Sequence, residues 1–168
     1  MKIEDRFFNT MLEISKQINF NAENINRAHL SDFISLILNI NEKGDRIFVY
    51  GAGRSGFIGR CFAQRLMHLG VNSCFVSDAI TPQFTSNDAL ILISGSGETT
   101  STVAIAKKAK EIGGKLLLLT SNPESTIGKI SDISLKIIGK SKDVATVQKT
   151  LAPYTSLFDI STLAVLDS

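Results

Sequence analysis

Apolar residues recur every three or four positions in two segments at the beginning of the chain. This period places the apolar side chains on one face of an α-helix. We therefore expect two helices within the first forty residues, the second of which ends before Gly44. The apolar positions are Ile3, Phe7, Met11, Ile14 and Ile18 in the first segment, and Phe33, Ile37 and Ile40 in the second.

Beyond Gly44, short runs of apolar and β-branched residues alternate with further helical segments. The runs cover residues 46–50, 73–76, 89–93, 115–120 and 132–138, and the helical segments cover roughly 57–69, 99–112, 123–130 and 153 to the last residue. Strands that are apolar on both faces are typical of a parallel sheet covered by helices. The pattern predicts a doubly wound α/β fold with a five-stranded parallel sheet in the order 2-1-3-4-5, flanked by helices.

The composition is that of a globular protein, and we expect a single domain of 1–168, with N-terminal helices in 1–43 and the α/β core in 44–168. Apolar residues make up 43% of the chain, yet no apolar run approaches the roughly 20 residues that cross a bilayer. The first ten residues lack the apolar core of a signal peptide, so we expect a cytoplasmic protein. The chain stops in what reads as an unfinished helix.

Charge and cysteine usage exclude several kinds of partner. The net charge is only +2 and no basic block is present, which argues against nucleic acid, and we expect no membrane partner either. Cys61 falls in a predicted helix and Cys74 in a predicted strand, and their spacing matches no metal-binding or redox motif. We expect both to be buried, unreactive thiols.

The loop after the third predicted strand has the sequence SGSGET, residues 94–99. Its glycines allow a sharp turn and a close approach to a ligand, and Ser94, Ser96 and Thr99 add hydroxyl donors. The predicted helix that follows would present free amide groups and the positive end of its dipole. Ser96 and Thr99 do not form a capping box, which requires Glu or Gln at the later position. A phosphate site without a lysine explains this loop better than a capped turn does.

The loop after the first predicted strand, GAGRSG (51–56), matches the dinucleotide pattern G-x-G-x-x-G. Asp78 follows the second predicted strand, about where a ribose-binding acid belongs, so a module that binds NAD is an alternative. Two observations weaken this alternative. A pyrophosphate bound at the first loop would not need a second phosphate-binding loop, and so short a chain leaves little room for a separate catalytic domain. A Walker A loop is excluded, because no Gly-Lys-Ser/Thr follows either glycine stretch.

Both loops lie at the carboxyl ends of strands, where ligands bind in open parallel sheets. Two anion-binding loops on neighbouring strands suit one phosphate monoester held between them. Ser55 would donate from one side, and Ser94, Ser96 and Thr99 from the other. Arg54 either adds positive charge to this site or faces solvent.

The loops and their flanks, GAGRSGFIGRCFAQRLMHLG and ILISGSGETTSTVAIAKKAKEIGGKLLLLT, resemble the sugar isomerase (SIS) domain superfamily. Together, GRSGF…RLMHLG and LAP…F make the chain similar to the 6-phospho-3-hexuloisomerase family, from about Gly44 to the C-terminus. The resemblance implies an enzyme that interconverts D-arabino-hex-3-ulose 6-phosphate and D-fructose 6-phosphate in the ribulose monophosphate pathway. It also implies that the reaction needs neither a metal nor an organic cofactor, and that the protein is typically a homotetramer.

The resemblance also implies which residues act. The family's proton-accepting carboxylate falls on position 159, where it could take a proton from C2 and deliver one to C3 through an enediol. Neutral donors around the phosphate would fix the far end of the sugar. The implied phosphate contacts are Arg54, Ser55, Ser94, Gly95, Ser96, Gly97, Glu98 and Thr99.

The chain departs from the family pattern beside that carboxylate. The family has Pro-Leu-Gly-Thr-x-Phe-Glu where residues 153–159 read PYTSLFD, so the base would be Asp159, and Thr155 replaces a glycine. Because aspartate is one methylene shorter, we expect the helix that carries Asp159 to lie slightly closer to the substrate. The alternative is an ordinary exposed aspartate, either in a relative with a different activity or in a sugar-phosphate sensor that has lost its base.

Glu98 and the two histidines have less definite roles. A phosphate would repel Glu98, which suits the first turn of a helix and could anchor the loop or contact another subunit. His68 lies 13 residues after Ser55, about 20 Å along one helix, too far for both to contact one small sugar phosphate. It either complements the helix C-terminus ahead of Gly70 or, as the resemblance implies, transfers protons in a neighbouring subunit. His29 is expected at the surface or in an interface.

The apolar stripe on the first predicted helix has no obvious place on a sheet already covered by crossover helices. We expect it to pack against other subunits, which would put the sites near subunit interfaces. Apart from copies of the chain, the expected partner is a small phosphosugar.

Overall fold

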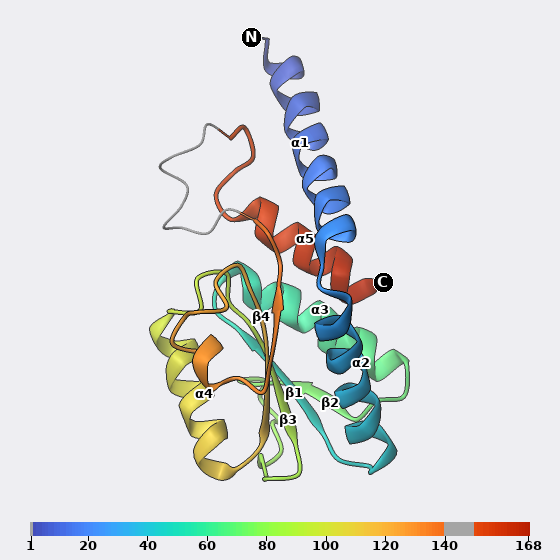
Figure 1. The fold of residues 1–168 in the computed structure, drawn as a ribbon, viewed down its shortest axis with the longest axis vertical. Helices are drawn as coiled ribbons and strands as arrows, with labels where there is room; N and C mark the ends of the chain where they lie inside the picture. The colour runs from blue at the N-terminus through green and yellow to red at the C-terminus, as the bar shows by residue number, and fades with distance from the viewer. Residues whose placement is uncertain (1, 140–149) are drawn as a thin grey trace.

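A five-stranded, all-parallel sheet forms the centre of the computed structural model (Figure 1), which describes residues 2–139 and 150–168. Its strands are β1 (Ile47–Gly51), β2 (Ser73–Phe75), β3 (Ala89–Ile93), β4 (Lys115–Thr120) and β5 (Ile133–Lys136). The helices are α1 (Ile3–Asn24), α2 (Arg27–Glu42), α3 (Arg54–His68), α4 (Thr100–Ile112) and α5 (Ser156–Asp167), with a 3₁₀ turn, η1 (Gly128–Ile130). The predicted α/β fold is confirmed.

The strand order is β2-β1-β3-β4-β5, as predicted. β1 pairs with β2 on one side and with β3 on the other, so the chain reverses its direction of travel across the sheet at β1. In the ladder between β1 and β3, Gly51 lies opposite Ile93. The loops that follow these two strands therefore begin side by side at the carboxyl edge of the sheet, where open parallel sheets bind ligands.

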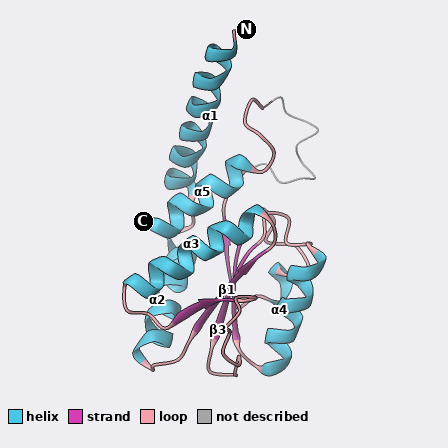
Figure 2. Cartoon of the chain, turned by 180° about the vertical axis from the view of Figure 1, so that it is seen from behind, coloured by secondary structure: helices cyan, strands magenta, loops and turns pink. Residues whose placement is uncertain are grey.

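Alternate residues of each strand pack on opposite faces of the sheet. Ile47 and Val49 of β1 belong to a core that includes side chains of α2, α3 and α5, whereas Phe48 packs with residues of α4 on the other face. Figure 2 shows α3 and α5 together on one side of the sheet and α4 apart from them. Because both faces are buried, the strands show no polar alternation, as the sequence pattern indicated.

Two amide side chains of α1 bind the chain just after β5. Asn21 is 3% exposed, and its side chain both donates to the carbonyl and accepts from the amide of Ile138, at 2.8 Å each. Gln17 Nε2 donates to the same carbonyl at 2.8 Å. Asn21 thus pairs with Ile138 through one donated and one accepted hydrogen bond, as a residue of a neighbouring strand would. This pairing fixes the C-terminal half of α1 against the sheet.

The N-terminal half of α1 projects beyond α5, away from the sheet (Figures 1 and 2). The predicted apolar stripe is therefore divided: Ile14 and Ile18 are half-buried, but Phe7 and Met11 remain 61% and 55% exposed. Although α1 has 22 residues, neither it nor any other helix in the described ranges has the length and apolar content that a membrane crossing requires.

The helix predicted over 123–130 is wrong, since this segment forms turns and the short η1. The chain folds back on itself so tightly that a Cβ on Gly128 would lie 1.8 Å from the carbonyl oxygen of Pro123. Ser125 Oγ accepts a hydrogen bond from the Gly128 amide, and Ile127 is completely buried. The burial of Ile127 and the hydrogen-bonded turn between Ser125 and Gly128 therefore stabilise a turn conformation in place of the expected helix.

The expectation of two buried cysteines is also wrong. Cys61 is exposed on α3, because it lies on the face of the helix that points away from the sheet. Cys74 is half-buried, and this burial raises the pKa of its thiol, which lowers the fraction of reactive thiolate.

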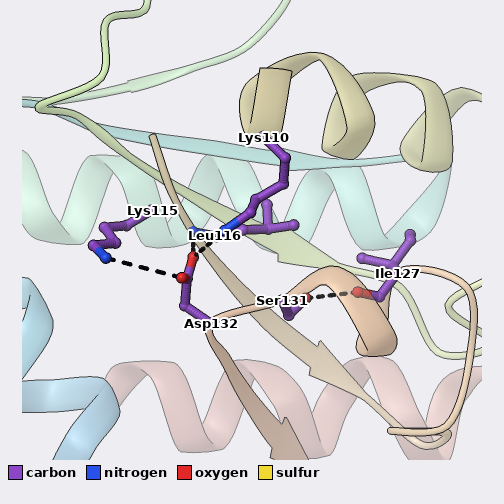
Figure 3. A network of polar contacts seen from close by, with 6 residues as sticks. All are labelled: Lys110, Lys115, Leu116, Ile127, Ser131 and Asp132. Atoms are coloured by element: carbon purple, nitrogen blue, oxygen red, sulfur yellow. Dashed lines mark hydrogen bonds and ion pairs between the residues drawn. The ribbon is translucent and has the colours of Figure 1, made fainter. Parts of the chain in front are cut away.

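Asp132 joins α4, β4 and the start of β5 (Figure 3). Its Oδ2 accepts from the Leu116 amide at 2.7 Å and from Lys110 Nζ at 3.0 Å, while Lys115 Nζ lies 3.9 Å from Oδ1. Burial alone would raise the pKa of Asp132, but the Leu116 hydrogen bond and the two lysines outweigh it and hold the pKa below its usual range. Nearby, Ser131 Oγ donates to the Ile127 carbonyl at 2.8 Å, which closes the turn before Asp132.

We predict that Asp132→Asn lowers the free energy of unfolding by about 1 kcal/mol at pH 7, because it removes the charge that Lys110 and Leu116 bind. The pKa is lower in the folded state than in the unfolded state, so this contribution is present above the ordinary aspartate pKa and is lost as the pH falls through the folded-state value. Urea denaturation from pH 7 to pH 3 should show the difference between wild type and variant shrinking. Glu111→Gln, which breaks the exposed pair with Lys108, is the control and should change stability by a few tenths of a kcal/mol.

Candidate functional site

A pocket of about 250 Å³ opens at the carboxyl edge of the sheet. It is lined by residues 52–55 after β1, by residues 93–96 and 99 after β3, and by residues 154, 155, 158 and 159 at the start of α5. The two predicted phosphate loops and the predicted carboxylate therefore surround one cavity. Its volume suits a small molecule such as a sugar phosphate.

Glycines bring the start of α3 close against β1. A Cβ on Gly56 would lie 2.6 Å from the carbonyl oxygen of Gly51, so a larger residue would push the helix away from the strand. Gly53, with a φ of +57°, makes the turn into α3. α3 consequently begins at Arg54, earlier than predicted, and its first two residues, Arg54 and Ser55, line the pocket beside the helix N-terminus.

The second loop is stabilised by its own serines. Ser94 Oγ accepts from the Gly97 amide and Ser96 Oγ accepts from the Glu98 amide, at 3.2 Å each. A hydroxyl that accepts such a bond keeps its proton for donation to a ligand. The two hydroxyls can therefore shape the loop and bind an anion at the same time.

The chain after β4 supports the same loop from outside the pocket. The Gly95 carbonyl accepts from Thr120 Oγ1 at 3.1 Å and from the Ser121 amide at 3.0 Å. Glu98 Oε1 accepts from the Thr126 amide at 2.7 Å, and this hydrogen bond lowers the pKa of Glu98. Glu98 is thus held away from the pocket and anchors the loop, one of the two roles expected for it.

Asp159 is 1% exposed and is the acceptor for three side-chain donors of the pocket. Its Oδ2 accepts from Arg54 Nε at 3.0 Å and from Thr155 Oγ1 at 2.7 Å, and its Oδ1 accepts from Ser55 Oγ at 3.1 Å. The alternative of an ordinary exposed aspartate is wrong, because the first turn of α5 is packed inside the domain. A buried carboxylate requires such partners, since burying it without them would be costly.

Most of the predicted site residues meet in this pocket, but three do not line it. Gly97 and Glu98 belong to the 94–99 loop but lie outside the pocket lining, where Gly97 packs against Ser125 and Glu98 accepts from the Thr126 amide. His68 is the last residue of α3, at the opposite end of the helix from Arg54, and is exposed. The predicted residues that line the pocket are Arg54, Ser55, Ser94, Gly95, Ser96, Thr99 and Asp159.

The start of α5 contributes three lining residues that were not predicted, namely Tyr154, Thr155 and Phe158. Phe158 packs beneath the second loop, where a Cβ on Gly95 would come within 3.3 Å of its ring. The sequence pointed to two of them indirectly, since Phe158 is the Phe of the LAP…F motif and Thr155 stands where the family pattern has a glycine. The backbone turn that brings Thr155 to the pocket, with a φ of +62°, cannot be read from a threonine.

The arrangement joins an anion site to a proton acceptor. Serine and threonine hydroxyls, Arg54 and the N-termini of α3 and α4 are suited to a phosphate. Asp159 supplies a carboxylate a few ångströms from those donors. In residues 2–139 and 150–168, no three His, Cys, Asp or Glu side chains are grouped closely enough to hold a metal ion.

Comparison with known proteins matches residues 40–164 to the model of the SIS domain family. The chain is 38% identical over 157 residues to 3-hexulose-6-phosphate isomerase of Bacillus subtilis, covering 93% of this chain and 83% of that protein. A hypothetical protein from Methanococcus jannaschii, whose crystal structure led to an inferred function of 3-hexulose-6-phosphate isomerase, has a TM-score of 0.75 and 35% identity over 92% of this chain and 82% of its own. The crystal structure of a putative sugar-phosphate isomerase from Listeria monocytogenes shares the fold, with a TM-score of 0.80 and 24% identity over 99% and 87% of the two chains.

We predict that Gly97→Ala weakens binding of inorganic phosphate by at least about tenfold in titration calorimetry. The backbone of Gly97 has a φ of +68°, and a Cβ there would lie 1.9 Å from Ser125 Oγ, so the loop must shift. Gly70→Ala is the control: its φ of +81° gives similar backbone strain, but no atom lies within 4 Å of the added Cβ. Equal phosphate affinities for the two variants would contradict the role given to the 94–99 loop.

Proposed function

The chain belongs to the SIS domain family, and from this premise we propose that it is a 3-hexulose-6-phosphate isomerase of the ribulose monophosphate pathway. It interconverts D-arabino-hex-3-ulose 6-phosphate and D-fructose 6-phosphate. Relatives that carry this enzyme name support the reaction. The observation that carries the proposal is the direct contact of Asp159 with Arg54 and Ser55, which joins a proton acceptor to the phosphate donors.

The phosphate binds between the two loops. Ser55 and Arg54 approach it from the start of α3, and Ser94, Ser96 and Thr99 approach it from the loop before α4. Uncharged donors and helix N-termini supply most of the binding, while the arginine, whose side chain is 59% exposed, adds charge from the solvent side. This anchoring fixes one end of the sugar, so the carbons that react lie at a constant distance from the carboxylate.

Asp159 is the general base. In the direction of fructose 6-phosphate it removes the proton from C2, which leaves an enediol between C2 and C3, and then delivers a proton to C3. One carboxylate serves both carbons because the planar intermediate presents them on the same face. The oxygens of the enediol exchange a proton through a second group.

Two other functions are less well supported. A non-catalytic sugar-phosphate sensor would need the two loops but not a buried carboxylate hydrogen-bonded to them. A dinucleotide-binding module would need Asp78 for the ribose, but Asp78 accepts a hydrogen bond from Arg60 on α3 and does not line the pocket.

We predict that the purified protein forms fructose 6-phosphate from the 3-hexulose phosphate in a coupled assay, at the same rate with and without chelator. Asp159→Asn should lower kcat by at least about 100-fold, because the amide cannot accept the proton. Asp167→Asn, on the same helix but exposed and paired with Arg65, should stay within about twofold of wild type. Full turnover by Asp159→Asn would exclude this residue as the base. If the wild-type protein binds the phosphosugar but does not convert it, the sensor function is favoured.

We also propose that the chain forms a homotetramer through the exposed half of α1. Phe7 and Met11 lie one turn apart on a face that nothing covers among the described residues, and Ile3 continues it at 81% exposure. Burial of this face against other copies removes apolar surface from water. We also propose that His68, which is exposed at the end of α3 opposite Arg54, exchanges protons in the pocket of a neighbouring subunit.

Phe7→Glu combined with Met11→Glu should convert the assembly to smaller species in sedimentation velocity, since two carboxylates cannot be buried in an apolar contact without partners. Lys16→Glu changes the net charge of the same helix by the same amount at an exposed position outside the stripe, and should leave the assembly intact. A wild-type monomer, or equal sedimentation of both variants, would contradict the proposed interface.

A further inference from the structure

Thr155 adopts a backbone conformation that is unfavourable for its residue type. Its φ and ψ are +62° and −8°, in the left-handed region that β-branched residues rarely occupy. Among the described residues, the only other non-glycine residue with a positive φ is Ser77. A strained residue beside a binding pocket persists only where the surrounding structure holds it, and such residues cluster at functional sites.

The side chain of Thr155 does not cap the helix that follows it, although threonine often does so at this position. It occupies the N-cap position of α5 but makes no capping hydrogen bond to the helix amides. Its hydroxyl instead donates to Asp159 Oδ2 at 2.7 Å, the shortest of the three side-chain bonds to that carboxylate. The strained backbone therefore turns the hydroxyl toward the carboxylate and away from the helix end.

The three donors around Asp159 differ in what else they are needed for. Arg54 and Ser55 belong to the phosphate site, so a bound phosphate dianion competes with Asp159 for both of them. Thr155 donates to the carboxylate from the same helix turn, four residues before it. It is thus the donor that can stay on Asp159 when the phosphate is bound.

The two oxygens of Asp159 are held differently as a result. Oδ1 accepts from the Ser55 hydroxyl, whereas Oδ2 accepts from both Arg54 and Thr155. If the phosphate draws Ser55 away, Oδ1 loses that donor while Thr155 still holds Oδ2. The base is then exposed to the sugar without losing its orientation.

We propose that Thr155 is a positioning residue, which fixes Asp159 through Oδ2 so that Oδ1 can accept the C2 proton once the phosphate has engaged Ser55. This inference rests on the proposed isomerase function. Positions 155 and 159 are also two of the four places where residues 153–159 depart from the family pattern, and these two side chains contact each other. The glycine of the family pattern would offer no hydroxyl at position 155 to orient this carboxylate.

Three substitutions of Thr155 separate the hydroxyl from the backbone. Thr155→Val keeps the shape and the β-branching, Thr155→Gly relieves the positive φ, and both remove the hydroxyl. We expect each to lower kcat by about tenfold or more with KM within about threefold of wild type, because the phosphate contacts are untouched. Thr155→Ser keeps the hydroxyl and should retain kcat within about threefold.

A purely structural role for Thr155 gives a different result. Thr155→Gly would then be as active as wild type, because glycine adopts the positive φ at this position most easily. A wild-type kcat in either Thr155→Val or Thr155→Gly overturns the proposal. If Thr155→Val does not fold, Thr155→Gly decides alone. Asp159→Asn distinguishes the two failures: full turnover there refutes the proposed base, whereas an inactive Asp159→Asn with fully active Thr155 variants refutes only the role of Thr155.

Discussion

The parallel ladder between β1 and β3 determines where this protein can bind a ligand. Gly51 and Ile93 lie opposite each other at the ends of these strands, so the loops that follow begin level and side by side. Each loop leads directly into a helix, and two helix N-termini therefore meet at one point of the sheet edge. Close packing of α3 on β1, which requires glycine at position 56, keeps the first of these helices near the second loop. No lysine is needed at such a site.

The start of α5 turns this anion site into a site for chemistry. It brings a carboxylate with 1% exposure into contact with residues of the first loop, although more than 100 residues separate them in the chain. The same hydrogen bonds that stabilise the buried carboxylate link it to the groups that recognise the phosphate. Recognition and proton transfer are therefore coupled through shared side chains, and the strained backbone at residue 155 is a local cost of that arrangement.

The sequence was sufficient for the strands and the two loops, because apolar runs and glycine-serine stretches have direct physical meaning, whereas the predicted strand order is one of the common doubly wound topologies. It was insufficient where a tertiary contact decided the outcome. Residues 123–130 have a helical pattern, but a close contact between Gly128 and Pro123 and the burial of Ile127 favour turns. The burial of Asp159 depends on the packing of the first turn of α5, and its bond to Thr155 on a positive φ that a threonine does not indicate. The exposure of Cys61 depends on which face of α3 meets the sheet.

In the proposed complex, one phosphate monoester lies between the loops after β1 and β3, with its sugar directed to the start of α5. A crystal structure with bound fructose 6-phosphate tests this most directly. We expect phosphate density within hydrogen-bond distance of Ser55 and of the hydroxyls in residues 94–99, and the C2–C3 bond of the sugar beside Asp159. Ligand density elsewhere, with this pocket empty at saturating fructose 6-phosphate, would contradict it.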